Sequence, residues 1–297
     1  MWNASLAGAI ALLALGMSMA SGEGVRGETD RVEPTAPARP ADQRGPAGEI
    51  ATSQANAPQA GSARLVALVI GNGAYPDADL TLNQPVSRAR ALADELKGRG
   101  FDLVTGENLG KQEMLRAIEA FVNKVTPGST ALIFFSGFGI QASRKTYLIP
   151  VNAQIWIEDD VRRTGVSVEP ILGELESRGA GVKLIILDAS RRNPFERRFR
   201  GFSAGLAGIY APDDTLVMYS AAPGKVINDT DDERSVLVSE LIAQIRSPGQ
   251  TAEEAFNRTR VAVSEASHRN QVPWVSSSLI ARFFFASPLP PGPDSTR

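Results

Sequence analysis

Three short segments carry the residue types from which a chemical site can be built. They are Gly71-Asn72-Gly73, Ser136-Gly137-Phe138-Gly139 and Asp188-Ala189-Ser190-Arg191, and each follows or ends an apolar run. Ser190 offers a hydroxyl nucleophile, but serine is a weak nucleophile unless an adjacent base activates it. The first segment is a bare Gly-x-Gly without a third glycine or a helix start at the required spacing, so a dinucleotide loop is disfavoured.

The cysteine and histidine content limits the chemistry further. The chain has no cysteine and one histidine, His268. It can therefore form no disulfide, no thiolate metal site and no cysteine nucleophile, and a zinc site is disfavoured. Acidic clusters at 77–79 and 229–233 lack the full spacing of a calcium loop, so solvated turns are the better interpretation. We predict no metal and no cofactor.

Composition and charge are those of an ordinary soluble globular protein. The 297 residues are 43% hydrophobic and 22% charged, and the net charge of -2 gives no case for binding nucleic acid. Five arginines lie in the run at 191–200. This run is interpreted as a solvated loop with Glu196 as an internal partner, and the alternative is a surface for an acidic partner.

The three segments must be positioned by the elements around them. Apolar runs predict strands at 64–71, 101–106, 130–137, 182–188, 215–221 and 278–285, with a short strand or turn at 146–150. Amphipathic spacing predicts helices at 84–99, 111–124, 168–178, 236–245 and 252–266. Alternating strands and helices favour a three-layer α/β domain with a mostly parallel sheet and helices on both faces. The three segments then lie at the carboxyl ends of strands, where such folds carry their functional loops.

Both ends of the chain differ in composition from this central part. Residues 1–20 contain a short apolar run followed by small residues, which predicts a secretory signal peptide and an exported, periplasmic or secreted protein. The run is short for a bilayer span, so no stable membrane span is expected after cleavage. Residues 21–62 are rich in Pro, Ala and Gly and are predicted to be a disordered linker, and 287–297 a disordered tail. The folded domain is predicted at 63–286.

Several spaced motifs carry a resemblance to a known family. LVALVIGNGAY, FFSGFG followed by YLIPVNA, and IILDASRRNPF occur in that order, and YSAAPG and QVPW occur later. Together they resemble the bacterial members of the caspase and metacaspase family, from about Arg64 to Phe285. The resemblance implies a caspase-like fold and the activity of a cysteine-type endopeptidase.

The family's activity requires a catalytic His and Cys, and the resemblance assigns their positions to Phe138 and Ser190. Phenylalanine has no titratable group, and the base that would activate a serine is the group that is missing. The resemblance also puts His268 at the end of a late helix, away from the loops. Phe138 is expected to pack into the space left by the lost pair, and the alternative is a plug or a surface for stacking a ligand.

Recognition of a basic substrate is also expected to change. The family's acidic specificity position remains as Asp188, but the resemblance places a second one at Arg88, which would repel a basic side chain and could pair with Asp188. Gly137 and Gly139 still flank Phe138. The N–H groups of Gly139 and Ser190 could form a nest that binds a carboxylate or a peptide carbonyl.

These observations predict a catalytically impaired caspase-like domain, a pseudo-peptidase that binds a protein or peptide partner or has a regulatory role. Two alternatives stay open. One is an active endopeptidase or hydrolase that uses Ser190 as its nucleophile. The other is a sensor that binds a small ligand in the cleft at the strand ends.

Overall fold

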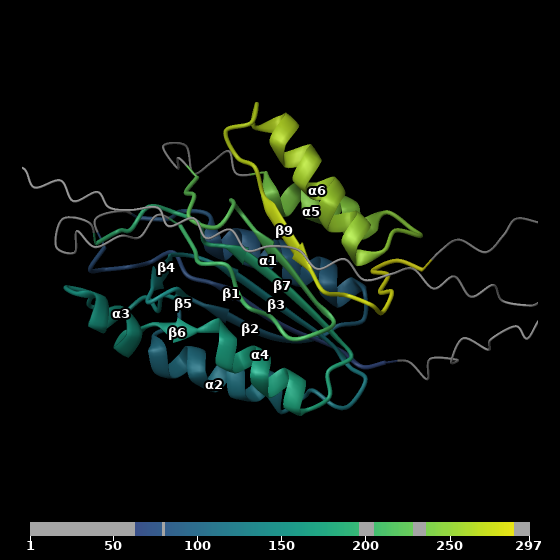
Figure 1. Ribbon diagram of the computed structural model, residues 1–297, viewed down its shortest axis with the longest axis horizontal. Coiled ribbons are helices and arrows are strands. Elements are labelled where there is room, and N and C mark those ends of the chain that lie inside the picture. The colour runs from purple at the N-terminus through teal and green to yellow at the C-terminus, as the bar shows by residue number, and fades with distance from the viewer. Residues whose placement is uncertain (1–62, 79–80, 196–204, 228–235, 288–297) are drawn as a thin grey trace, which may run out of the picture. The chain divides into compact units, whose positions relative to one another are not determined.

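The computed structural model describes residues 63–78, 81–195, 205–227 and 236–287 (Figure 1). Several sequence-based predictions fall on residues outside these ranges. They are the signal peptide at 1–20, the linker at 21–62, the acidic cluster at 229–233, and all but the first residue of the tail at 287–297.

A six-stranded sheet in the order β2-β1-β3-β7-β8-β9 forms the centre of the described domain. Its first five strands are parallel, and β9 is antiparallel to β8. Long apolar runs form these strands because both faces of the sheet are covered. The strands are β1 (Leu65–Gly71), β2 (Asp102–Glu107), β3 (Thr130–Ser136), β7 (Val182–Asp188), β8 (Thr215–Tyr219) and β9 (Trp274–Ser277).

Helices cover both faces of this sheet, as predicted. The apolar sides of α2 and α4 pack with residues such as Leu68 and Phe135 on one face, and those of α1, α5 and α6 pack with Val69 and Phe134 on the other (Figure 1). Their bounds are α1 (Pro85–Gly98), α2 (Lys111–Val122), α4 (Val168–Ser177), α5 (Leu237–Arg246) and α6 (Ala252–Ala266). No helix within the described ranges is both long and apolar enough to cross a bilayer.

A smaller antiparallel sheet follows β3 and was only partly anticipated. Its strands are β4 (Gly139–Ala142), β5 (Lys145–Leu148) and β6 (Val166–Ser167), and α3 (Glu158–Thr164) lies between β5 and β6. Ser143 and Arg144 form the tight turn between β4 and β5, with φ values of 48° and 63°. The short strand predicted at 146–150 is part of this hairpin. Neither residue of the turn is glycine, so the glycine that usually marks a tight hairpin turn in a sequence is missing here.

The last predicted strand, at 278–285, is wrong. The strand that pairs with β8 is Trp274–Ser277, and only an isolated bridge between Thr251 and Phe284 occurs in the later segment. Phe283 and Phe285 instead pack with Phe101 on the helix-covered core. The apolar pattern is therefore only partly matched by burial: Phe285 is 7% exposed and is buried by side-chain packing, whereas Ile280 is 85% exposed.

The start of α1 packs directly on the end of β1, and this contact should be sensitive to one added methyl group. A Cβ at Gly71 would lie 2.5 Å from the carbonyl oxygen of Pro85 and 2.8 Å from the Cβ of Ala89. We expect Gly71→Ala to lower the free energy of unfolding by about 1–3 kcal/mol in urea titrations, as overpacking does. Gly98→Ala at the end of α1 is the control, because nothing lies within 4 Å of its added Cβ. Equal stabilities of the two variants would contradict the expectation.

Candidate active site

The strand ends bring the three predicted segments together. In the register of the sheet, Gly71 pairs with Ser136 and Ser136 pairs with Asp188. The loops after β1, β3 and β7 are therefore neighbours at the carboxyl edge of the sheet. The expectation that the three segments lie at the carboxyl ends of strands is confirmed, and any site built from them would lie at this edge.

Phe138 is a core residue. Its side chain is 1% exposed and belongs to a cluster with Ile140, Tyr147 and Phe195. Its ring lies 4.8 Å from the ring of Tyr75, with the two planes tilted by 59°. The packing interpretation of Phe138 is thus confirmed, and the ring offers no exposed surface on which a ligand could stack.

Tyr75 fixes the backbone around Phe138. Its hydroxyl donates to the carbonyl oxygen of Ile149 at 3.0 Å and accepts from the N–H of Phe138 at 3.1 Å. Burial raises the pKa of Tyr75 well above its ordinary value, so this hydroxyl stays protonated. A Cβ at Gly137 would lie 2.6 Å from the Tyr75 hydroxyl, so the close approach requires glycine here.

Ser190 is buried, and no described residue places a base beside it. Its N–H donates to Ser220 Oγ at 3.1 Å, and its carbonyl oxygen accepts from the N–H of Ile227 at 2.8 Å. Within the described ranges its own hydroxyl oxygen has no hydrogen-bond partner. An activated serine needs a base within about 3 Å, and none of the described residues supplies one.

The predicted N–H nest is not preformed. Gly139 N donates to the carbonyl oxygen of Ala189 at 3.2 Å, and Gly137 N donates to that of Asp188 at 3.3 Å. The N–H of Ser190 is bonded to Ser220. A ligand would have to displace these bonds before it could use the N–H groups of Gly139 and Ser190.

Asp188 is the centre of a buried ionic network. Its Oδ2 accepts from Arg88 Nη1 at 3.2 Å, from Arg191 Nη2 at 3.4 Å and from Ser136 Oγ at 2.7 Å. The side chains of Arg88 and Asp188 are 8% and 0% exposed. The pairing of Arg88 with Asp188 is thus confirmed, although the two residues are 100 positions apart in the sequence.

The charges in this network hold Asp188 ionised. Burial by itself would raise the pKa of Asp188, but the attraction of Arg191 and Arg88 and the hydrogen bond from Ser136 outweigh it, so its pKa lies below the ordinary value. Two guanidinium groups, those of Arg88 and Arg191, already bind this carboxylate, so a basic substrate side chain would have to compete with them for it.

Arg191 lies in the third predicted segment, but the sequence analysis assigned it no role in the site. It is fully buried and also donates through Nη1 to the carbonyl oxygens of Gly137 and Asp188. The interpretation of the arginine run as a solvated loop is therefore wrong for Arg191 and for 193–195, which are buried, whereas Arg192 is exposed. Residues 196–200 of the run, Glu196 included, lie outside the described ranges. One feature of the sequence could have indicated the Arg191–Asp188 ion pair: Arg191 lies only three residues after Asp188, which ends β7.

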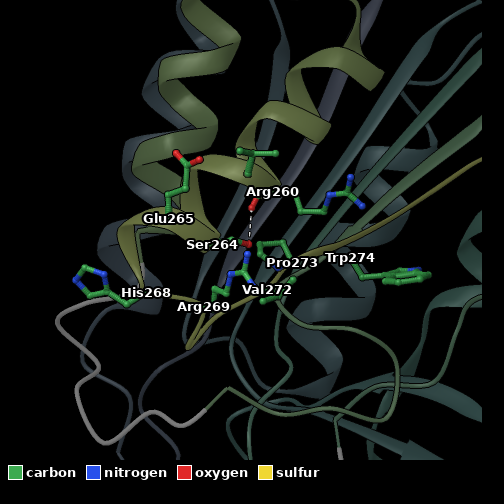
Figure 2. A pocket seen from close by; sticks show the side chains of 9 residues that line it. Arg260, Ser264, Glu265, His268, Arg269, Val272, Pro273 and Trp274 are labelled. Atoms are coloured by element: carbon green, nitrogen blue, oxygen red, sulfur yellow. Dashed lines mark hydrogen bonds between the residues drawn. The ribbon is translucent and has the colours of Figure 1, made fainter.

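His268 lies elsewhere. It is exposed just after α6 and lines a cavity of about 600 Å³ with Arg260, Arg269 and Trp274. In Figure 2 its ring, like the Glu265 carboxylate, extends away from the other side chains that line this cavity. None of the predicted site residues lines the cavity. The expectation that His268 lies at the end of a late helix, away from the strand-end loops, is confirmed.

Removing the Asp188 charge should destabilise the protein most at neutral pH. The pKa of Asp188 is lower in the folded than in the unfolded state. The ionised carboxylate therefore contributes fully to the free energy of unfolding above pH ~4, and this contribution is lost as the pH falls through the pKa of the folded state. We expect Asp188→Asn to lose about 3–5 kcal/mol at pH 7, because two buried arginines lose the charged carboxylate that both of them bind, and to lose less in acid. Urea titrations at pH 7 and pH 3 measure this difference.

The matched control for this prediction is Asp102→Asn. Asp102 also pairs with two cations, Arg64 and Lys124, but its side chain is 37% exposed. Exposed ion pairs contribute little to stability, so this variant should differ far less from the wild type. If both variants lost the same free energy of unfolding, the buried Asp188 network would contribute no more to stability than an exposed pair of salt bridges, which would contradict the prediction.

Phe138 should behave in mutagenesis as a packing residue. We expect Phe138→Ala to lose about 3–5 kcal/mol of unfolding free energy, as large-to-small changes in cores do. Phe138→Leu should lose clearly less because it keeps most of the buried volume. Thermal and urea unfolding of the two variants measure the effect. Wild-type stability of Phe138→Ala would show that the ring is dispensable to the core.

Comparisons with known proteins agree with the geometry. The Drosophila initiator caspase Dronc has a similar fold, with a TM-score of 0.50 and 14% identity over 74% of this chain and 82% of that one. Mouse and human mucosa-associated lymphoid tissue lymphoma translocation protein 1 are each 26% identical over 132 residues, which is 44% of this chain. These matches span only 15% and 16% of the curated relatives' own lengths.

The family assignment covers most of the chain. The sequence model of the caspase domain, Peptidase_C14, matches residues 64–284. This range begins just before β1 and ends just after Phe283, so it contains the whole sheet and the helices on both of its faces. The three-layer fold and the similarity to Dronc agree with it, and the chain belongs to the caspase domain family.

Proposed function

We propose that this chain is a catalytically impaired caspase-like domain that acts as a protein- or peptide-binding regulatory module. In this proposal, Phe138 and Ser190 occupy the positions of the family's catalytic His and Cys. The observation that carries it is the state of Ser190, whose buried hydroxyl has no hydrogen-bond partner among the described residues. Without a base, this hydroxyl is a poor nucleophile.

The surroundings of Phe138 support the same conclusion. The hydroxyl of Tyr75 bonds the N–H of Phe138, and the ring is packed in an apolar cluster. A proton-transfer group is therefore absent from this position, and the ring's contribution is to packing. The residues that remain hold a fixed loop structure, which a binding surface requires, but Phe138 supplies no group that could transfer a proton.

Recognition is proposed to differ from that of relatives that cleave after basic residues. Asp188 is already engaged by Arg88 and Arg191, so it is not available as the sole counter-charge for a substrate Arg or Lys. Like charges near a binding position disfavour a basic group. The proposed partner therefore does not depend on a basic side chain inserted at Asp188.

Peptide turnover by the full chain tests this proposal. Libraries with Arg, Lys or Asp at the cleavage position, with and without calcium, should give no turnover above buffer, and Ser190→Ala should give the same result. Peptides retained by the protein should be recovered intact. An active caspase-family peptidase assayed in parallel shows that the libraries can be cleaved.

The alternative, a hydrolase that uses Ser190, makes the opposite prediction. Turnover by the native chain that disappears in a correctly folded Ser190→Ala variant would establish it and would overturn the proposal. Circular dichroism and the thermal transition of Ser190→Ala show whether the variant is folded. Turnover that survives this substitution would point to a different catalytic group and would also contradict the proposal.

A further inference from the structure

The cavity of about 600 Å³ that Figure 2 shows is a groove between the second half of α6 and the chain that enters β9, and it is called the α6–β9 groove below. Three of its apolar side chains are about half exposed: Val261 at 50%, Val272 at 49% and Trp274 at 46%. Single exposed apolar side chains are common, but a group of them beside a hollow is typical of an interaction site. The other lining residues are Arg260, Ser264, Glu265, His268, Arg269 and Pro273.

The α6–β9 groove contains two arginines, Arg260 and Arg269, that are not engaged by other side chains. Within the described ranges, neither guanidinium group takes part in an ion pair or a hydrogen bond. Exposed arginines elsewhere in the domain do, as Arg90 does with Glu107. An arginine presents five N–H donors in a planar fork that fits a carboxylate. These two side chains can therefore donate to a partner without first breaking a bond to a described residue.

Glu265 is the acidic residue among the described residues that line the groove, and it does not neutralise this charge. It forms no ion pair with a described residue. Figure 2 shows its carboxylate pointing away from Val272 and Pro273, whereas the guanidinium group of Arg269 is turned toward them. The side of the groove next to its apolar residues is therefore electropositive, and such a surface attracts negatively charged ligands.

The turn after α6 is held in one conformation, which fixes the backbone of Arg269. Its N–H donates to the carbonyl oxygen of Ser264 at 2.7 Å. Ser267 Oγ accepts from the N–H of Gln271 at 3.0 Å and donates to its carbonyl oxygen at 3.0 Å. His268 and Arg269 have φ values of 50° and 65°, which the chain retains because these bonds support them. A preformed turn lowers the ordering cost that binding must overcome.

The positions of the two arginines relative to α6 predict unequal contributions. The carboxyl end of a helix carries a partial negative charge that acts mainly on the last turn. Arg269 comes just after the helix end at Ala266, so this partial charge offsets some of its attraction for an anion. Arg260 lies more than one turn before that end. We therefore expect Arg260 to contribute more to binding than Arg269.

We propose that the α6–β9 groove binds an acidic segment of a partner protein that also carries a bulky apolar side chain. Carboxylates of the segment pair with Arg260 and Arg269, and its apolar side chain packs against Val272 and Trp274. Tryptophan and arginine are the residue types that contribute most to protein interfaces. Nucleic acid fits less well, because the net charge of the chain is -2 and a phosphate backbone leaves the apolar residues without a partner.

This inference rests on the proposed function, because it assumes a protein or peptide ligand, and it adds the surface and the charge of that ligand. The two can still fail separately. None of the predicted strand-end residues lines the groove, so Arg260→Gln should not change the result of the turnover assay. Absent binding would overturn the groove alone, whereas turnover that depends on Ser190 would overturn the proposed catalytic impairment alone.

Fluorescence anisotropy with the full chain tests the proposal, using a fluorescein-labelled peptide of glutamates around a central Leu-Phe pair. We expect saturable binding that weakens as NaCl is added. Arg260→Gln should weaken binding about tenfold or more, as expected for loss of a charged hydrogen bond, and Arg269→Gln should weaken it less. Arg258→Gln is the matched control, because Arg258 is also on α6 and is exposed but does not line the groove.

Tryptophan emission shows whether the peptide reaches the groove. The unlabelled peptide should shift the emission of the full chain to shorter wavelength, because binding removes water from the half-exposed ring of Trp274. Trp274→Phe should abolish this shift. Trp156→Phe should retain it, because Trp156 is 58% exposed but does not line the groove. A shift lost in Trp156→Phe and kept in Trp274→Phe would place the peptide elsewhere and would overturn the proposal.

Four further results would overturn the proposal. The first is no saturable binding of the peptide at millimolar concentrations. The second is equal weakening by Arg258→Gln and Arg260→Gln, and the third is equal binding of a peptide of glutamates alone; either would indicate general attraction to the surface. The fourth is a concentration-dependent dimer of the full chain that excludes the peptide and that Trp274→Ala dissociates, which would identify a second copy as the occupant.

Discussion

The buried carboxylate of Asp188 is the constraint on which the candidate site depends. A lone buried charge is costly, so it must be paired and hydrogen-bonded. Arg88 from α1, Arg191 from the loop after β7 and Ser136 at the end of β3 meet this requirement together. The same contacts hold α1 and two strand ends in one arrangement. Breaking the network therefore affects the fold and the site at once.

Around this network, the strand-end loops hold side chains that fill space and N–H groups that already have hydrogen-bond acceptors. Phe138 packs against Tyr75, and the N–H groups of Gly139 and Ser190 donate within the protein. The sheet and its helices are stabilised mainly by apolar burial, so the fold does not by itself fix which chemical groups stand at the strand ends.

Most of the framework could be predicted from the sequence for a simple physical reason. Buried parallel strands need continuous apolar runs and covering helices need an apolar stripe, and both patterns are local. They predicted the strands of the central sheet up to β8 and the helices on its two faces. They failed at β9, because Phe283 and Phe285 are apolar for packing, and at the β4–β5 hairpin, whose turn is Ser143-Arg144.

By itself the sequence determined which chemical groups are present: no cysteine, one histidine, and Phe138 and Ser190 in the strand-end motifs. It also indicated that Arg88 and Asp188 could pair. Only the tertiary structure decided that Arg191 is buried in the same network and that the N–H groups expected to form a nest already have acceptors. The physical reason is that composition and periodicity are local properties, whereas the partner of a buried charge or N–H depends on segments that are distant in sequence and adjacent only in the folded chain.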